Sequence, residues 1–360
     1  MTHRRPPASG TGLRMAHVVR SDNFAGVERY ITYVAPELAG RGLHVVVIGG
    51  DPARMAGALA PAGIEYRPAT TTLQVARQLL ACRPLDLVHT HMSAAEVAAL
   101  VTRPLTGAPL VTTRHFAARR GRSTAGRVAA LAVARTVAVE IAISRFVADA
   151  IGEPSVVLPS GVPRTDRAPT TPDRRPVVLM AQRLEREKDS SVGLRAWAAS
   201  GLAAAGWRLV VAGGGALAGE LRDLAGALGA GGSVDFVGPQ ADIGRLFESA
   251  GVLLATAPEE PFGLSVVEAM AAALPVVASG SGAHLETVGA CSARWLFPAG
   301  DHEACAQRLR ELALAPATRQ AYGDALQAFQ RRHFDLGDHV DRLVELYLGV
   351  TGRRPPAAVR

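Results

Sequence analysis

The sequence predicts an α/β protein of two domains, each a doubly wound parallel sheet covered by helices. The chain has 360 residues, and single hydrophobic cores usually stop growing at roughly 250 to 300 residues. Short β-branched runs alternate with longer Ala- and Leu-rich stretches, which is the pattern of parallel α/β sheets. Residues 163–176 are rich in Pro, Thr and charge without apolar periodicity, which is typical of an interdomain linker.

The alternation predicts the elements of the first half in order. The expected strands are 15–20, 44–48, 87–90, 110–113, 138–144 and 155–158, and the expected helices are 27–40, 73–81, 94–102 and 145–151. His115 and Arg114 follow the strand 110–113 directly. Because ligands bind at the carboxyl ends of strands in open parallel sheets, His115 is a candidate site residue.

The second half repeats the pattern. Its expected strands are 177–180, 208–212, 234–237, 252–255 and 276–278, and its expected helices are 191–199, 217–228, 242–249, 264–273, 303–331 and an amphipathic helix at 332–348. Two such domains would place ligand sites in the cleft between them.

Composition supports a folded protein. Hydrophobic residues make up 48% of the chain and charged residues 20%, which excludes general disorder. Three widely spaced cysteines have no metal-ligand spacing, so reduced thiols in a cytoplasmic protein are expected. The start, MTHRRPPASGTG, lacks the apolar stretch of a secretion signal. The window 125–143 is interrupted by three charged residues, so no transmembrane helix is predicted.

Charge is distributed unevenly. Residues 1–170 have a balance of +9 and residues 171–360 a balance of −2. A basic first half could bind nucleic acid, an anionic membrane or a phosphorylated substrate. Only 5% of residues are aromatic, so the stacking platforms of single-strand binders are scarce. No nucleic-acid partner is therefore expected. Lys188 is the only lysine among 39 basic residues.

The sharpest motif is the segment 260–271, EPFGLSVVEAMA. Glu260 lies in a loop after a strand, and Gly263 allows close approach of the backbone to a ligand. The amides at Gly263 and Leu264 would be unpaired at a helix start, which suits a phosphate. Glu268 would lie about 12 Å further along the helix, so two carboxylates could grip both ends of a ligand. The alternative is that Glu260 caps the helix and Glu268 lies on a solvated face.

The longer segment EPFGLSVVEAMAAALPVVAS resembles the Glu-x7-Glu signature of retaining glycosyltransferases of family 4. Other segments resemble the family's landmarks in the family's order, namely FAGVERY, VHTHMS, VTTRHF, VVLPSGVP, AQRLEREKD, LVVAGGG and VDFVG. The resemblance covers residues 14–348, nearly the whole chain. It implies the GT-B fold, in which two Rossmann-like domains face a central cleft.

This resemblance sets the expected organisation. The expected parts are a flexible tail at 1–13, an acceptor-binding domain at 14–165, a linker at 166–176, a donor-binding domain at 177–331, a helix at 332–348 that crosses back to the first domain, and a flexible tail at 349–360.

The resemblance also implies roles for individual residues. Arg183 and Lys188 would contact the donor's diphosphate and stabilise the charge on the leaving nucleotide, as two cations facing a departing phosphate can do. Because they supply this positive charge, no metal and no cofactor is expected. Glu268 would accept hydrogen bonds from ribose hydroxyls, and Glu260 would hold hydroxyls of the transferred sugar.

The remaining roles complete the expected site. Val237 and Gly238 would border the base, Gly26 would let the first domain's backbone approach the diphosphate, and His115 would lie near the sugar and the acceptor. The expected catalytic residues are His115, Arg183, Lys188 and Glu260. The expected donor-binding residues are Gly26, Arg183, Lys188, Val237, Gly238, Glu260, Phe262, Gly263, Leu264 and Glu268.

Several positions depart from the family's pattern. Ala25, Ala181 and Asp189 stand where the family has glycine, Ser160 where it has asparagine, and Ala283-His284 where a second glycine is usual. Asp189 adds a negative charge beside Lys188, and His284 could touch the donor sugar.

Two further histidines and a basic run complete the candidates. His89 and His91 share a strand, and we expect them to point to opposite faces, with one structural and His91 toward the cleft. Arg119, Arg120 and Arg122 belong to a basic run after His115. This run could be a solvated loop, or it could bind an acceptor phosphate or the inner face of an anionic membrane.

The expected function is retaining transfer of a sugar from a UDP- or GDP-linked donor to an acceptor hydroxyl, in the biosynthesis of a glycan, glycolipid or natural product. A GT-B nucleotide-sugar epimerase, a non-catalytic sugar-nucleotide-binding protein and a NAD-linked oxidoreductase remain as alternatives. The glycines of 213–219 do not match the GxGxxG fingerprint, which disfavours the last of these.

Overall fold

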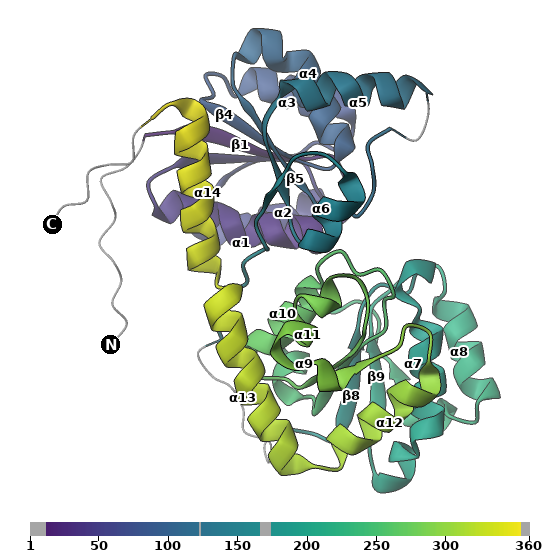
Figure 1. Cartoon of the computed structure of the whole chain (residues 1–360). Helices are drawn as coiled ribbons and strands as arrows, with labels where there is room; N and C mark the ends of the chain where they lie inside the picture. Colours follow the sequence, from purple (N-terminus) through teal and green to yellow (C-terminus); the bar gives the residue numbers. More distant parts are fainter. Residues whose placement is uncertain (1–11, 122–123, 166–173, 354–360) are drawn as a thin grey trace, which may run out of the picture. The chain divides into compact units, whose positions relative to one another are not determined.

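The computed structural model describes residues 12–121, 124–165 and 174–353 (Figure 1). The described residues fall into two compact units, the first within residues 12–161 and 336–353 and the second within residues 162–335. Residues 1–11, 166–173 and 354–360, which hold most of the predicted tails and linker, lie outside the described ranges, as does Arg122.

The first unit is built on a seven-stranded parallel sheet in the order β3-β2-β1-β4-β5-β6-β7. Its strands are β1 (Arg14–Val19), β2 (His44–Ile48), β3 (Glu65–Arg67), β4 (Leu87–His91), β5 (Leu110–Arg114), β6 (Val137–Ala142) and β7 (Val156–Val157). The chain runs outward from β1 to β3 and then returns to β4 on the other side of β1. The point at which the strand order reverses, the topological switch point, therefore lies between β1 and β4.

Helices cover both faces of this sheet. They are α1 (Gly26–Gly40), α2 (Pro52–Leu59), α3 (Thr72–Ala81), α4 (Ser93–Thr106), α5 (Thr124–Thr136), α6 (Arg145–Ile151) and α14 (Leu336–Thr351). Successive strand residues point to opposite faces, so Met15 packs in the core cluster with α1 and α14 while Ala16 packs in the cluster with α3 and α4. The sequence predicted neither α2 nor β3, both of which are short and partly exposed. It did not predict α5 either.

The last helix, α14, belongs to the first unit. This agrees with the prediction that the last helix crosses back to the first domain. Leu336, Val340, Leu343 and Tyr347 recur at helical spacing and are buried in the cluster that includes α1. Figure 1 shows α14, in yellow, beside α1.

The boundaries of this helix differ from the predicted 332–348. The preceding helix, α13, runs to His333, and α14 begins at Leu336 and extends to Thr351, three residues into the predicted tail. The break has a physical cause, because the Phe334 carbonyl accepts hydrogen bonds from the Val162 amide at 2.9 Å and the Gln330 side chain at 3.0 Å. These bonds occupy a carbonyl that a continuous helix would use internally.

The second unit holds a six-stranded parallel sheet in the order β10-β9-β8-β11-β12-β13. Its strands are β8 (Val177–Ala181), β9 (Arg208–Ala212), β10 (Val234–Phe236), β11 (Val252–Ala255), β12 (Val276–Ser279) and β13 (Leu296–Phe297). Its α-helices are α7 (Ser190–Ser200), α8 (Ala218–Ala227), α9 (Gly244–Ser249), α10 (Leu264–Ala271), α11 (Val288–Ser292), α12 (His302–Ala313) and α13 (Pro316–His333). The switch point of this sheet lies between β8 and β11.

A buried ion cluster corrects the prediction for Arg120. Its guanidinium donates to Glu96 and Glu140 at 2.8 Å and also pairs with Glu153, and only 2% of its side chain is exposed. Arg114 is bound to Glu140 in the same cluster. Buried guanidinium groups need such partners to offset their desolvation, so Arg120 cannot face a membrane or an acceptor. No helix in the described ranges is long and apolar enough to cross a bilayer.

We predict that Arg120→Met lowers the free energy of unfolding by about 3 to 5 kcal/mol, because it leaves buried carboxylates without their cation. Arg119→Met is the matched control, since Arg119 is exposed and such a surface change should stay within about 0.5 kcal/mol. Chemical denaturation of both variants measures the difference. Equal stabilities of the two variants would contradict the structural role of the cluster.

Candidate functional site

A cation and a carboxylate meet at the switch point of the second sheet. Lys188 follows β8 and Glu260 follows the neighbouring strand β11. Lys188 Nζ donates to Glu260 Oε2 at 2.6 Å, and the side chains are only 15% and 16% exposed. The two predicted residues, 72 positions apart, are therefore brought together at the edge of the sheet where ligands bind.

Two side chains, which also bond each other, fix the backbone carbonyl of Lys188. Its carbonyl accepts from Thr256 Oγ1 at 2.7 Å and from Gln182 Nε2 at 3.1 Å, and Gln182 also donates to Thr256 at 2.9 Å. Gln182 follows β8 and Thr256 follows β11, so both sides of the switch point hold the short 3₁₀ turn Arg186–Lys188. Sequence reasoning missed both residues, although their positions directly after two strands were a usable signal.

Asp189 explains one departure from the family's pattern. Its backbone has φ 44° and ψ 48°, the left-handed conformation in which glycine is most favoured and Asp or Asn is tolerated. Its side chain accepts a hydrogen bond from Ser191 at 2.9 Å. Asp189 therefore adopts the conformation that a glycine would take, and its carboxylate is directed to Ser191.

The surroundings of Glu260 keep its carboxylate ionised. Burial would raise the pKa of Glu260, but the nearby Lys188 ammonium and the Gly263 amide outweigh this effect and hold that pKa below its usual value. The backbone is equally confined, because the Ala283 amide donates to the Glu260 carbonyl at 2.8 Å. A Cβ at Gly282 (φ 56°) would lie 2.8 Å from both the nitrogen and the oxygen of Glu260, so this close approach requires glycine.

Helix α10 begins directly after Gly263, as the motif predicts. Gly263 has φ 83°. Its amide donates to the Glu260 carboxylate, so the prediction that this amide is unpaired is wrong, and Glu260 caps the helix start at this position. The amides from Leu264 onward are the ones left to face an anion. Glu268 is 8% exposed, which argues against a solvated face. The helix starts at Leu264, as expected, and the span of about 12 Å between the two carboxylates stays a prediction.

Other predicted donor residues lie around this centre in the second unit. Arg183 is exposed and donates to Glu187 at 2.7 Å, so the structure does not bring it to the Lys188–Glu260 pair. Val237 is 42% exposed beyond the end of β10, and the Gly238 carbonyl accepts from the Gly213 amide. Phe262 is buried and packs edge-on against Phe334, with ring centroids 5.7 Å apart.

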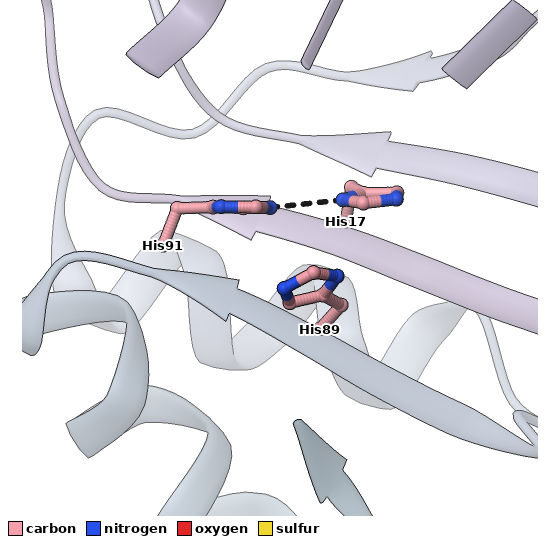
Figure 2. Close-up of side chains that lie close together, drawn as sticks. All are labelled: His17, His89 and His91. Carbon is pink, nitrogen blue, oxygen red and sulfur yellow. Dashed lines mark hydrogen bonds between the residues drawn. The ribbon is translucent and has the colours of Figure 1, made fainter. Parts of the chain in front are cut away.

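The first unit holds a chain of buried histidines at its own switch point. His115 Nε2 lies 3.0 Å from His91 Nδ1, and His91 Nε2 lies 2.9 Å from His17 Nδ1. Figure 2 shows the rings of His91 and His17 in line, with His89 beside them. His17 lies on β1, which neighbours β4; it was missed because only the strand order brings it near His91.

The expectation that His89 and His91 point to opposite faces is wrong. Their ring centroids are 4.4 Å apart, because residues two apart on a strand share a face. His89 bonds Tyr347 through Nδ1 at 2.6 Å and Thr113 through Nε2 at 2.7 Å. Its role is therefore to join β4, β5 and α14.

The histidine chain is uncharged at neutral pH. Burial, with a smaller contribution from His339, lowers the pKa of His17 and of His115 to about 3, and burial also holds the pKa of His91 well below its usual value. Neutral imidazoles can serve as hydrogen-bond donors and acceptors or as metal ligands.

A metal fits this cluster poorly. The candidate ligand nitrogens of His17, His89 and His91 lie within 4.8 Å of one another, but both nitrogens of His89 and of His91 already bond neighbours. Among these three residues only His17 Nε2 lacks a partner within the described chain. The geometry is that of hydrogen-bonded imidazoles.

Gly26, the remaining predicted residue, opens α1 in the first unit. The turn before it is held by Glu28, whose carboxylate accepts from the Ala25 amide at 2.8 Å and from Ser21. A Cβ at Gly26 would meet no described atom within 4 Å. Within the described part of the first unit, no atom therefore blocks the approach of a ligand to the Gly26 backbone.

Solved glycosyltransferases share this fold along nearly the whole chain. HepE from Anabaena, solved in complex with UDP-glucose, aligns with a TM-score of 0.79 at 22% identity, over 94% of this chain and 100% of that chain. Sucrose-phosphate synthase from Thermosynechococcus elongatus aligns with a TM-score of 0.76 at 19% identity, over 94% and 99%. Likeness at this identity defines the fold, which is GT-B.

Sequence comparison gives the family. Residues 162–328 match the model of the glycosyl transferases group 1, and residues 24–165 match that of glycosyltransferase family 4. EpsD of Bacillus subtilis (strain 168) is 32% identical over 140 residues, which are 39% of this chain and 36% of that relative. The chain thus matches about a third of the length of this curated relative. It belongs to the group 1, family 4-like glycosyltransferases.

We predict that Asp189→Gly stabilises the second unit by about 1 kcal/mol, because glycine adopts the left-handed conformation without a Cβ penalty. For a unit of this size the melting temperature should rise by roughly 2 to 4 °C, measured by calorimetry. Asp189→Ala, which also removes the carboxylate but keeps the penalty, should melt lower than the glycine variant. If the two variants melt together, backbone strain at this position is not the cause.

Proposed function

We propose that this chain transfers a sugar from a UDP- or GDP-linked donor to an acceptor hydroxyl with retention of anomeric configuration. The observation that supports this most directly is the Lys188–Glu260 pair at the switch point of the second sheet, close to the first turn of α10. Such an arrangement offers positive groups for a diphosphate and a carboxylate for hydroxyls. The UDP-glucose bound in HepE supports a nucleotide sugar as the donor.

Each residue of the second unit has a chemical task in this proposal. The Lys188 ammonium and the exposed Arg183 guanidinium stabilise the negative charge that develops on the departing diphosphate. The ionised Glu260 accepts hydrogen bonds from hydroxyls of the transferred sugar. Glu268 accepts from the ribose, and Val237 and Gly238 border the base.

The first unit supplies the acceptor site in this proposal, with His115 as a contact residue. Its lowered pKa makes His115 a poor base for the acceptor hydroxyl. Front-face transfer needs no such base, because the departing phosphate oxygen takes the acceptor proton as the new glycosidic bond forms. The charge that stabilises this oxygen then comes from Lys188 and Arg183.

Nucleotide sugars should stabilise the protein against heat, because a ligand that binds only the folded state shifts unfolding by mass action. A thermal-shift screen would compare UDP-glucose and GDP-mannose with UDP, GDP and NADH. Analysis of the product then distinguishes a new glycosidic bond from an epimerised free nucleotide sugar. Stabilisation by NADH but by no nucleotide or nucleotide sugar would refute the proposal.

We predict that Lys188→Arg and Glu260→Gln each lower kcat by about 100-fold or more, the size expected for the loss of one group that stabilises transition-state charge. The wider guanidinium cannot occupy the partly buried position 2.6 Å from Glu260. Arg186→Lys, a conservative exchange at an exposed position of the same turn, is the control and should keep normal activity. Full activity of Lys188→Arg would show that the ammonium is not required.

A further inference from the structure

His284 lies at the edge of the donor site described above, on a turn that the proposed mechanism does not use. The 3₁₀ turn Gly282–Leu285 follows β12, which neighbours β11 in the sheet. The Ala283 amide binds the Glu260 carbonyl at 2.8 Å, so this turn is fastened to the loop that carries Glu260. The imidazole of His284 is completely buried.

Its hydrogen bond determines which nitrogen carries the proton. His284 Nδ1 lies 3.1 Å from the Ser279 carbonyl oxygen, and a carbonyl can only accept, so the proton is on Nδ1. Burial keeps the ring neutral by lowering the pKa of His284, despite the opposing effect of Glu260. Nε2 therefore presents a lone pair and no proton.

This Nε2 atom is buried and bonds no atom of the described chain. An unsatisfied buried acceptor costs free energy, and the charges that act on this ring belong to Glu260 and Lys188. A lone pair can bind a hydroxyl or N–H group but not an oxygen of an ionised phosphate, which is itself an acceptor. The matching ligand group is therefore a hydroxyl of the sugar, beside those that Glu260 would hold.

We propose that His284 Nε2 accepts a hydrogen bond from one hydroxyl of the donor's sugar and so restricts which sugars the site binds. This inference rests on the proposed function. It assigns a specificity-determining role to a residue at which this chain departs from the glycine-rich pattern of its family. Sites built to hydrogen-bond a substrate hydroxyl discriminate against analogues that lack it, because a buried polar group is then left unpaired.

The test is a matched pair of variants in binding experiments. His284→Asn can keep a donor to the Ser279 carbonyl but has no atom at the position of Nε2, whereas His284→Gln can place an amide oxygen there. We expect His284→Asn to weaken binding of the sugar nucleotide about tenfold and His284→Gln to weaken it less. UDP, which has no sugar beyond its ribose, should bind wild type and both variants equally.

Titration calorimetry would measure the dissociation constants of UDP and UDP-glucose, or of GDP and GDP-mannose if those bind instead. Single-deoxy analogues of the sugar then identify the hydroxyl. Wild type should bind one analogue about tenfold more weakly than the parent sugar nucleotide, and His284→Asn should bind that analogue and the parent alike.

Two results would overturn the inference. If His284→Asn weakens UDP and UDP-glucose by the same factor, the residue is structural. If its dissociation constants for the parent and all deoxy analogues match those of wild type, Nε2 contacts no sugar hydroxyl. In either case the proposed function would stand, whereas failure of all nucleotides and nucleotide sugars to bind wild type would refute the proposed function itself.

Discussion

The ion pair between Lys188 and Glu260 is the constraint around which the second unit's site is organised. Two charges that are mostly withdrawn from water must compensate each other, and they can do so only because β8 and β11 are neighbours at the switch point. The carbonyl of Lys188 is clamped by Gln182 and Thr256, and the backbone of Glu260 is held by the turn after β12. Three adjacent strands thus position one cation and one carboxylate.

The first unit has a switch point of the same kind, but different side chains lie there. There the switch point between β1 and β4 is bridged by His17 and His91, two imidazoles 2.9 Å apart that are neutral because they are buried. Their chain ends at His115, beyond the end of β5. A charged pair suits a diphosphate, whereas neutral imidazoles suit hydroxyl groups. This division is consistent with a donor site in the second unit and an acceptor site in the first.

Much of the fold could be predicted, because β-branched strands alternate with longer helices in both halves. Of the elements that escaped prediction, β3 and β13 are only two or three residues long and carry no periodicity. The candidate site residues were predicted from motifs of the family resemblance, but Lys188 and Glu260 are 72 positions apart, and only the strand order shows that they touch. Arg120 was misjudged for a related reason, since its partners Glu96 and Glu140 lie on α4 and β6.

The second unit's site also separates ligand groups by the direction of their hydrogen bonds. Lys188 and the first-turn amides of α10 donate, so they attract phosphate oxygens. Glu260 and His284 Nε2 accept, so they repel phosphate and attract hydroxyls. Lys188, a donor, bonds the acceptor Glu260 directly, so the donors and acceptors lie close together. A ligand that satisfies both the donors and the acceptors carries phosphate and hydroxyl groups within a short span. A sugar attached to a diphosphate has this arrangement.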